Sequence, residues 1–183
     1  SASGAESFYK FEDGKKKFYD VNSKKYINVP SSQNHYILDA FRENKQILRN
    51  PECTVHDIGD GVMCIEFQTK GNSIGEGIAK GINEAIDIAE RDGWNGIVIG
   101  NNDKQFSVGA NLMNMGMAAM QKNFDEIEKF LVGFQKILMR MRTCNVPVVS
   151  ATHGFVMGGG LEVSIHCDAG IHASESYIGL VEA

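Results

Sequence analysis

The pattern of apolar and polar residues changes character about a quarter of the way along the 183-residue chain. The first part, including SFYKFEDGKKKFYD, mixes aromatic and charged residues, and only His35–Asn50 has the spacing of an amphipathic helix. From Cys53 onward the pattern becomes regular. We therefore interpret residues 1–51 as a linker or the tail of a preceding domain, and residues 52–183 as a folded domain.

Regular elements follow one another along this domain. TVHDIGDGVMCIEF alternates on both sides of Asp60–Gly61, which predicts a β-hairpin. Apolar residues at helical spacing predict helices over residues 74–93 and 123–143, and Gly158–Gly160 open a third helix. Short apolar runs typical of buried strands are GIVIGN and VPVVSAT, and AGIHA is predicted to form a third strand. Strands that alternate with helices in this way predict an α/β fold whose sheet is covered by helices.

Composition excludes several classes of protein. Hydrophobic residues make up 43% and charged residues 22%, which predicts a globular rather than a disordered chain. The net charge of -5 and the lack of a basic stripe disfavour nucleic-acid binding. The sequence contains no run of about 18 apolar residues, so it predicts no membrane span. The four cysteines include no C-x-x-C pair, so we expect reduced thiols, no metal site and a cytoplasmic protein.

Two glycine-containing loops follow predicted strands, at the positions where α/β folds bind ligands. They are FSVGAN (Phe106–Asn111) and GFVMGGGLE (Gly154–Glu162). Glycine lets backbone N–H groups approach a ligand, and the second loop opens a helix whose first N–H groups are unpaired. One N–H group from each loop would form an oxyanion hole. Close helix–strand packing is the alternative reason for the glycines, whereas neither loop has a phosphate-binding motif.

Two carboxylates stand close to these loops in apolar sequence. Glu162 falls in the first turn of the glycine-opened helix, and Glu182 ends the run YIGLVE. Each alone is typical of a surface charge, and Glu162 would also suit the helix dipole. Two carboxylates beside one oxyanion hole would instead form a general acid/base pair.

Other reactive side chains near the loops are weaker candidates. His153 has no evident serine or cysteine nucleophile, and the consecutive residues His166, Cys167 and Asp168 point in different directions on a helix. The methionines of NLMNMGMAAM indicate a flexible apolar wall, which would suit an acyl chain.

FSVGANL, followed at a distance by PVVSATHGFVMGGGLEVSIHCDAGIHASESYIGLVE, resembles the enoyl-CoA hydratase/isomerase (crotonase) superfamily. The resemblance begins near Cys53 and implies the ClpP/crotonase-like fold of stacked ββα units, usually assembled as trimers. It implies an acyl-CoA thioester as substrate, a homo-oligomer and no cofactor. Family members continue well beyond the second glutamate, so we expect a crotonase fold that is incomplete at its C-terminal end.

The resemblance also implies roles for individual residues. The oxyanion-hole donors fall on the backbone N–H groups of Ala110 and Gly159, and the catalytic acids fall on Glu162 and Glu182. Members with both acids are typically hydratases, in which Glu162 would activate water and Glu182 would protonate the α-carbon. Asn111 departs from the aspartate usual in the family. Further substrate or CoA contacts are expected at Asn72, Ser73, Ile74, Gly75, Ser107, Gly109, Leu112 and Gly158.

The stretch GAESFYKFEDGKKKFYD and the helix expected after it resemble a junction in bacterial multifunctional β-oxidation proteins. In those proteins a 3-hydroxyacyl-CoA dehydrogenase precedes a C-terminal hydratase domain. This implies an enoyl-CoA hydratase of fatty-acid β-oxidation within a parent that binds NAD, although no NAD site is expected in these residues. Isomerisation, another crotonase reaction, and a non-catalytic acyl-CoA-binding or assembly domain stay open as alternatives.

Overall fold

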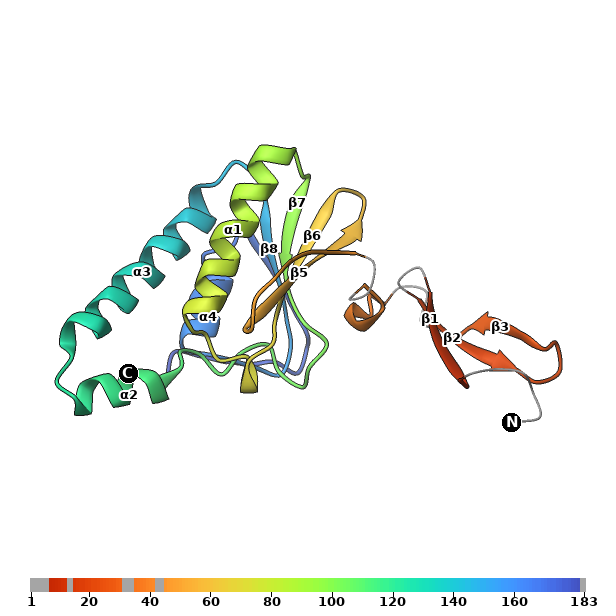
Figure 1. The fold of residues 1–183 in the computed structure, drawn as a ribbon, viewed down its shortest axis with the longest axis horizontal. Helices are drawn as coiled ribbons and strands as arrows, with labels where there is room; N and C mark the ends of the chain where they lie inside the picture. The colour runs from red at the N-terminus through yellow and green to blue at the C-terminus, as the bar shows by residue number, and fades with distance from the viewer. Residues whose placement is uncertain (1–6, 13–14, 31–34, 42–44, 182–183) are drawn as a thin grey trace.

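The computed structural model describes residues 7–12, 15–30, 35–41 and 45–181. Its centre is a six-stranded sheet with the order β10-β8-β7-β6-β5-β4 (Figure 1). The strands β6, β7, β8 and β10 run parallel, whereas β4 and β5 are antiparallel to their neighbours. Their bounds are β4 Gln46–Arg49, β5 Cys53–Gly59, β6 Val62–Phe67, β7 Gly96–Ile99, β8 Val148–Thr152 and β10 Ala169–His172.

Helices cover one face of this sheet (Figure 1). They are α1 Glu76–Asp92, α3 Phe124–Thr143 and α4 Gly159–Ile165, and the shorter α2 Leu112–Met120 leads into α3. The predicted apolar face of α1 is buried against the strands, with Ile78, Ile82 and Ile86 at most 1% exposed. Gly93 ends α1 in the left-handed conformation and donates its N–H to Ala89. The hairpin, the three helices and the three strands predicted from the sequence are therefore confirmed, and the third of these strands, β10, is an exposed edge strand.

A second, smaller layer of extended segments lies beyond the large sheet and contains both glycine loops. The strand β9 (Phe155–Met157) pairs in parallel with β11 (Tyr177–Gly179). Isolated bridges join Ser107 to Val156 and Ile74 to Ala110. Each winding of the chain thus passes from the large sheet to this layer and, in three of the windings, on to a helix, which is the expected ββα repeat.

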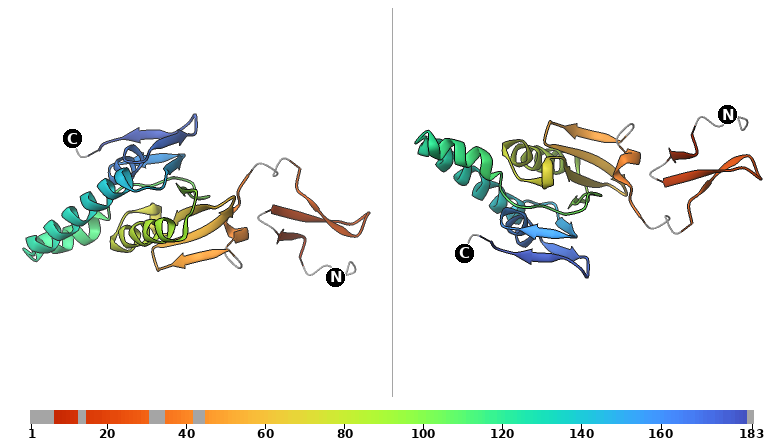
Figure 2. Two further views of the ribbon diagram at one scale, coloured as in Figure 1. Left: turned by 90° about the horizontal axis from the view of Figure 1, so that it is seen from above. Right: turned by 90° about the horizontal axis from the view of Figure 1, so that it is seen from below.

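The region before Cys53 contains short strands and differs from the prediction over His35–Asn50. Three antiparallel strands, β1 Tyr9–Glu12, β2 Lys15–Asp20 and β3 Lys25–Asn28, form a separate small sheet to one side (Figure 2). The amphipathic helix predicted over His35–Asn50 is wrong: the described residues form a 3-10 turn, η1 Leu38–Phe41, and the strand β4. Pairing with β5 outweighs the helical spacing, because the strand also packs Ile47 and Leu48 against the core. The division at residue 51 stays a prediction.

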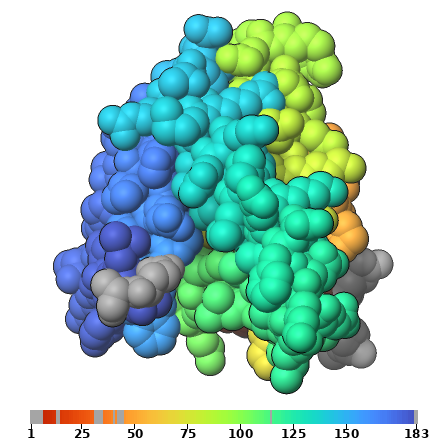
Figure 3. All heavy atoms as spheres, turned by 90° about the vertical axis from the view of Figure 1, so that its left-hand side faces the viewer, coloured from red at the N-terminus to blue at the C-terminus, as the bar shows by residue number. Residues whose placement is uncertain are grey.

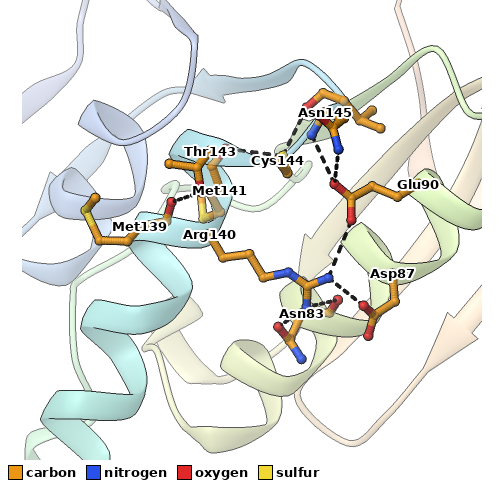
Figure 4. Close-up of polar contacts among 10 residues, drawn as sticks. Asn83, Asp87, Glu90, Met139, Arg140, Met141, Thr143, Cys144 and Asn145 are labelled. Carbon is orange, nitrogen blue, oxygen red and sulfur yellow. Dashed lines mark hydrogen bonds and ion pairs between the residues drawn. The ribbon is translucent and has the colours of Figure 1, made fainter.

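The last turns of α3 are fixed to α1 by one arginine (Figure 4). The Arg140 guanidinium donates to the backbone and side-chain oxygens of Asn83 and lies within ion-pair distance of Asp87 and Glu90. Glu90 in turn accepts hydrogen bonds from the backbone and side-chain nitrogens of Asn145. These contacts fix the angle of α3, whose other end borders the candidate site.

One buried ionisable pair lies within the sheet. The ring nitrogen Nε2 of His56 lies 2.8 Å from Oε2 of Glu66, and both residues are at most 4% exposed.

Within the described ranges, no helix combines the length and apolar character needed to cross a membrane.

Candidate active site

The two glycine loops pack directly against each other. A Cβ atom on Gly109 would lie 2.9 Å from the Met157 carbonyl oxygen, and one on Gly160 would lie 2.7 Å from the Cβ of Ser107. Gly109 and Gly158 also have φ angles of 98° and 47°, which side chains rarely allow. In the space-filling view, the green segment that contains the first loop lies between teal α3 and the blue C-terminal part (Figure 3).

The N–H group of Ala110 is oriented by the carbonyl group of its own peptide unit. The Gly109 oxygen accepts a hydrogen bond from the N–H of Ile74 at 2.8 Å. In a planar trans peptide the C=O and N–H groups point in opposite directions. The Ala110 N–H therefore points away from Ile74, and none of the described residues accepts a hydrogen bond from it.

The N–H group of Gly159 is oriented in the same way. The Gly158 oxygen accepts the first hydrogen bond of α4, from the N–H of Glu162 at 3.0 Å. The Gly159 N–H consequently points out of the start of the helix, and none of the described residues accepts it. A Cβ on Gly159 would lie 3.3 Å from the Ala110 nitrogen, so two unpaired N–H groups lie side by side.

Glu162 lies on the first turn of α4, three residues after Gly159. It is half-buried, and its carboxylate makes no hydrogen bond to the part of the chain that the structure describes. Glu182 lies outside the described residues. The segment that leads to Glu182 is held at the site, because the N–H of Gly158 donates to the Gly179 oxygen at 2.9 Å. That the two acids flank one oxyanion hole stays a prediction.

The predicted CoA contacts fall into two groups. Asn72, Ile74 and Ser107 are at most 1% exposed, and the polar side chains of this group bond within the protein. Leu112 is 73% exposed at the start of α2. Contact with CoA by Asn72, Ser73, Ile74, Gly75, Ser107, Gly109, Leu112 and Gly158 stays a prediction, which for the buried members requires backbone atoms.

A cavity of about 420 Å³ opens beside the first loop, next to Asn111. Met115, Ala118, Ile127 and Phe130 supply its apolar wall. Glutamates also line it: Glu52, Glu76 and Glu126. The methionine-rich run predicted as a flexible wall is thus a helix, α2, with part of one face on the cavity.

α3 contributes a contact that the sequence analysis missed. The ring of Phe134 would lie 3.5 Å from a Cβ on Gly159, and it stacks on Phe130 with a centroid distance of 6.3 Å. A continuous apolar surface therefore joins the two N–H groups to the cavity. The recurrence of Phe130 and Phe134 at helical spacing was the available signal, but it did not show which loop they face.

The remaining reactive side chains near the loops bond to the backbone. Nε2 of His153 lies 2.6 Å from the Asp103 oxygen, and Nδ1 of His166 lies 2.7 Å from the Glu162 oxygen. Asp168 accepts a hydrogen bond from the N–H of Val148. Each group holds a loop or a helix end in place.

Comparison with known proteins identifies the family. Residues 57–183 match the sequence profile described as enoyl-CoA hydratase/isomerase. The chain belongs to the enoyl-CoA hydratase/isomerase family. Its large sheet, glycine loops and α4 have the crotonase fold, as the similarity to solved structures confirms: an enoyl-CoA hydratase from Thermoplasma volcanium GSS1 superposes with a TM-score of 0.63 at 24% identity.

Two curated relatives illustrate the range of sequence similarity. A Bacillus subtilis (strain 168) protein named "Probable 3-hydroxyacyl-CoA dehydrogenase" is 36% identical over 181 residues, which is 98% of this chain but 23% of that protein. A "Crotonyl-CoA hydratase" from Syntrophomonas wolfei subsp. wolfei is 34% identical over 87 residues, covering 47% of this chain and 32% of the relative. The superposition with the Thermoplasma structure covers 73% of this chain and 52% of that structure. It thus spans from about a quarter to half of these proteins' length.

Proposed function

We propose that the chain forms the catalytic part of an enoyl-CoA hydratase, which adds water in syn fashion across the double bond of a 2-enoyl-CoA thioester. The observation that carries the proposal is the pair of unpaired N–H groups, of Ala110 and Gly159, one helical turn from Glu162. Both donors hold the thioester carbonyl oxygen. Negative charge grows on that oxygen as water attacks the β-carbon, so these hydrogen bonds strengthen toward the transition state.

The two acids move the protons of the reaction. Glu162 accepts a hydrogen bond from the attacking water and helps to activate it as its oxygen bonds to the β-carbon. Glu182 holds the same water, takes the proton that the water loses and delivers that proton to the α-carbon, which collapses the enolate to the saturated thioester. One water is consumed, and no electrons are exchanged with a cofactor. Both acids act from the same face as the water, which produces the syn outcome.

The rest of the substrate follows the surface around these groups. The acyl chain enters the cavity walled by Met115, Ala118 and Phe130, and the CoA part follows the segment Asn72–Gly75. In the parent protein this site works beside a 3-hydroxyacyl-CoA dehydrogenase, in a cytoplasmic homo-oligomer that oxidises fatty acids. The similarity to the longer Bacillus subtilis protein, which is named a probable 3-hydroxyacyl-CoA dehydrogenase, supports the dehydrogenase part of this proposal.

Hydration of crotonyl-CoA, followed by loss of the absorbance of its conjugated thioester, tests the proposal. The chain and a longer protein that contains it are assayed with Glu162→Gln and Glu182→Gln, and with Glu175→Gln as an exposed control. We expect each active-site change to lower kcat by about 100- to 10,000-fold and the control to leave it unchanged. Binding of acyl-CoA without turnover in the longer protein would instead support the non-catalytic alternative.

Isomerisation is the second candidate, because the matched family covers hydratases and isomerases. An isomerase moves a proton between two carbons and incorporates no oxygen from water. A 3-enoyl-CoA substrate would then gain the conjugated absorbance, and no 3-hydroxyacyl product would form. Formation of the hydroxyacyl product with oxygen from labelled water favours the hydratase.

A further inference from the structure

A buried network behind the first glycine loop connects that loop to the segment after β6. The side-chain amide of Asn72 donates to the Gln105 carbonyl oxygen at 2.9 Å. The Ser107 hydroxyl donates to the Asn72 carbonyl oxygen at 2.7 Å and accepts the N–H of Gly109 at 3.1 Å. Asn72 and Ser107 are both at most 1% exposed, so these bonds are made away from water.

The backbone of Asn72 is itself unusual. Its φ angle is 53°, in the left-handed region that asparagine occupies more readily than most residues. This conformation turns the chain so that, two residues later, the N–H of Ile74 reaches the Gly109 oxygen and the Ile74 oxygen accepts the N–H of Asn111. The two peptide units that flank Ala110 are therefore each bonded to Ile74, in the segment that Asn72 shapes.

We propose that Asn72 is a positioning residue that, with Ser107, sets the direction of the Ala110 N–H group. In this role the side chain of Asn72 bonds to Gln105 and contacts no reacting atom. It bonds the segment after β6 to the Gln105 carbonyl oxygen. The Ser107 hydroxyl bonds the Asn72 carbonyl oxygen of the same segment to the N–H of Gly109. The inference rests on the proposed function, because it assigns a purpose to the orientation of one oxyanion-hole donor.

Two substitutions of Asn72 separate hydrogen bonding from packing. Asn72→Gly keeps the left-handed backbone but removes the amide, whereas Asn72→Asp keeps the shape and places a carboxylate oxygen against the Gln105 carbonyl. If the hydrogen bond to Gln105 matters, Asn72→Asp is the more damaging change. If only volume matters, Asn72→Gly is the more damaging one, because it leaves a void.

The matched control is Asn95, which makes the same type of bond at a turn of the hairpin. Its side-chain amide donates to the Asp60 carbonyl oxygen at 2.8 Å and joins two loops there. Asn95→Asp therefore disturbs an amide–carbonyl bond of similar length, at an exposed position outside the candidate site. Ser107→Ala completes the series, because it removes the second bond of the network.

The experiment measures kcat and KM for crotonyl-CoA, the infrared stretch of the bound thioester carbonyl, and hydrogen exchange of residues 105–111. For Asn72→Asp we expect kcat to fall by up to about 100-fold with KM unchanged, since the oxyanion bond matters most in the transition state. The carbonyl stretch should move toward that of the free thioester, and exchange should quicken. Asn95→Asp should change none of these.

Equal kcat, carbonyl stretch and exchange in Asn72→Asp and Asn95→Asp would overturn the inference. Greater damage from Asn72→Gly than from Asn72→Asp would also overturn it. A wild-type protein that hydrates no enoyl-CoA would refute the proposed function instead. In that case hydrogen exchange of residues 105–111 still decides whether Asn72 holds the loop.

Discussion

A Cβ atom on Gly159 would lie 3.3 Å from the backbone nitrogen of Ala110, although the two residues come from loops that follow different strands. This close approach places two unpaired N–H groups within reach of a single oxygen. The packing explanation and the oxyanion explanation for the glycines therefore describe the same feature. Only a loop without side chains brings the second donor this near to the first.

Gly159→Ala tests that proximity. Alanine is the better helix former by about 1 kcal/mol, so the change should not lower stability much. The added methyl group meets the Ala110 nitrogen and the Phe134 ring, which forces the donors apart by a few tenths of an ångström. We expect kcat for enoyl-CoA hydration to fall by about 10- to 100-fold while the melting temperature is retained.

Gly133→Ala on α3 is the control for Gly159→Ala, because a Cβ at Gly133 would meet nothing within 4 Å. It offers the same gain in helix propensity without any contact to the loops. Equal turnover in the two variants would show that the spacing between Ala110 and Gly159 does not matter for catalysis.

Much of the fold follows from local pattern, because helical and alternating spacings report which face of an element is buried. α1 and the hairpin of β5 and β6 are examples, and the position of Glu162 on α4 followed from the glycines before it. β4 was not predictable in this way. Ile47 and Leu48 suit a helix or an edge strand equally, and pairing with β5 decided between them.

The orientation of the backbone N–H groups at the site could likewise not be predicted from the sequence. The direction of the Ala110 N–H depends on the bond from Ile74 to Gly109, which are 35 residues apart. The buried pair of His56 and Glu66 likewise depends on strand register. Such long-range contacts leave no periodic signal along the chain, whereas a glycine-rich motif does.

Ala118→Phe tests whether the cavity receives the acyl chain. Ala118 is 6% exposed and lines the cavity of about 420 Å³, so a phenyl ring there occupies space that a long chain needs. We expect kcat/KM to fall for long-chain 2-enoyl-CoA and to stay unchanged for crotonyl-CoA. The measurement is kcat/KM across a series of acyl lengths, with Ala119→Phe on the exposed side of α2 as control. An equal loss at every length would refute this placement of the chain.

Arg140→Lys probes the attachment of α3 to α1. Lysine keeps the charge but cannot bond to Asn83, Asp87 and Glu90 together, as the planar guanidinium does (Figure 4). We expect a loss of about 1 kcal/mol in stability, or about 2–4 °C in melting temperature, because the group is partly exposed. Arg142→Lys, at an exposed position on the same helix, should change neither. A melting temperature equal to that of the wild type would show that the cluster adds nothing to stability.

The buried thiols predict a loss of stability in alkali. Burial raises the pKa of Cys53 to about 11 and the pKa of Cys64 and Cys167 to about 12, from an ordinary value of 9.0. Below pH 9 these thiols are protonated in both folded and unfolded chains, and their full contribution to stability is present. Above pH 9 the unfolded thiols ionise first, so unfolding releases protons and stability falls as pH rises toward 11 or 12. Urea unfolding at pH 8 and pH 10 measures this loss, and Cys64→Ala isolates the contribution of one thiol. We expect a smaller loss between the two pH values in Cys64→Ala than in the wild type, whatever stability the variant starts from; equal losses would show that Cys64 contributes nothing to the alkaline sensitivity.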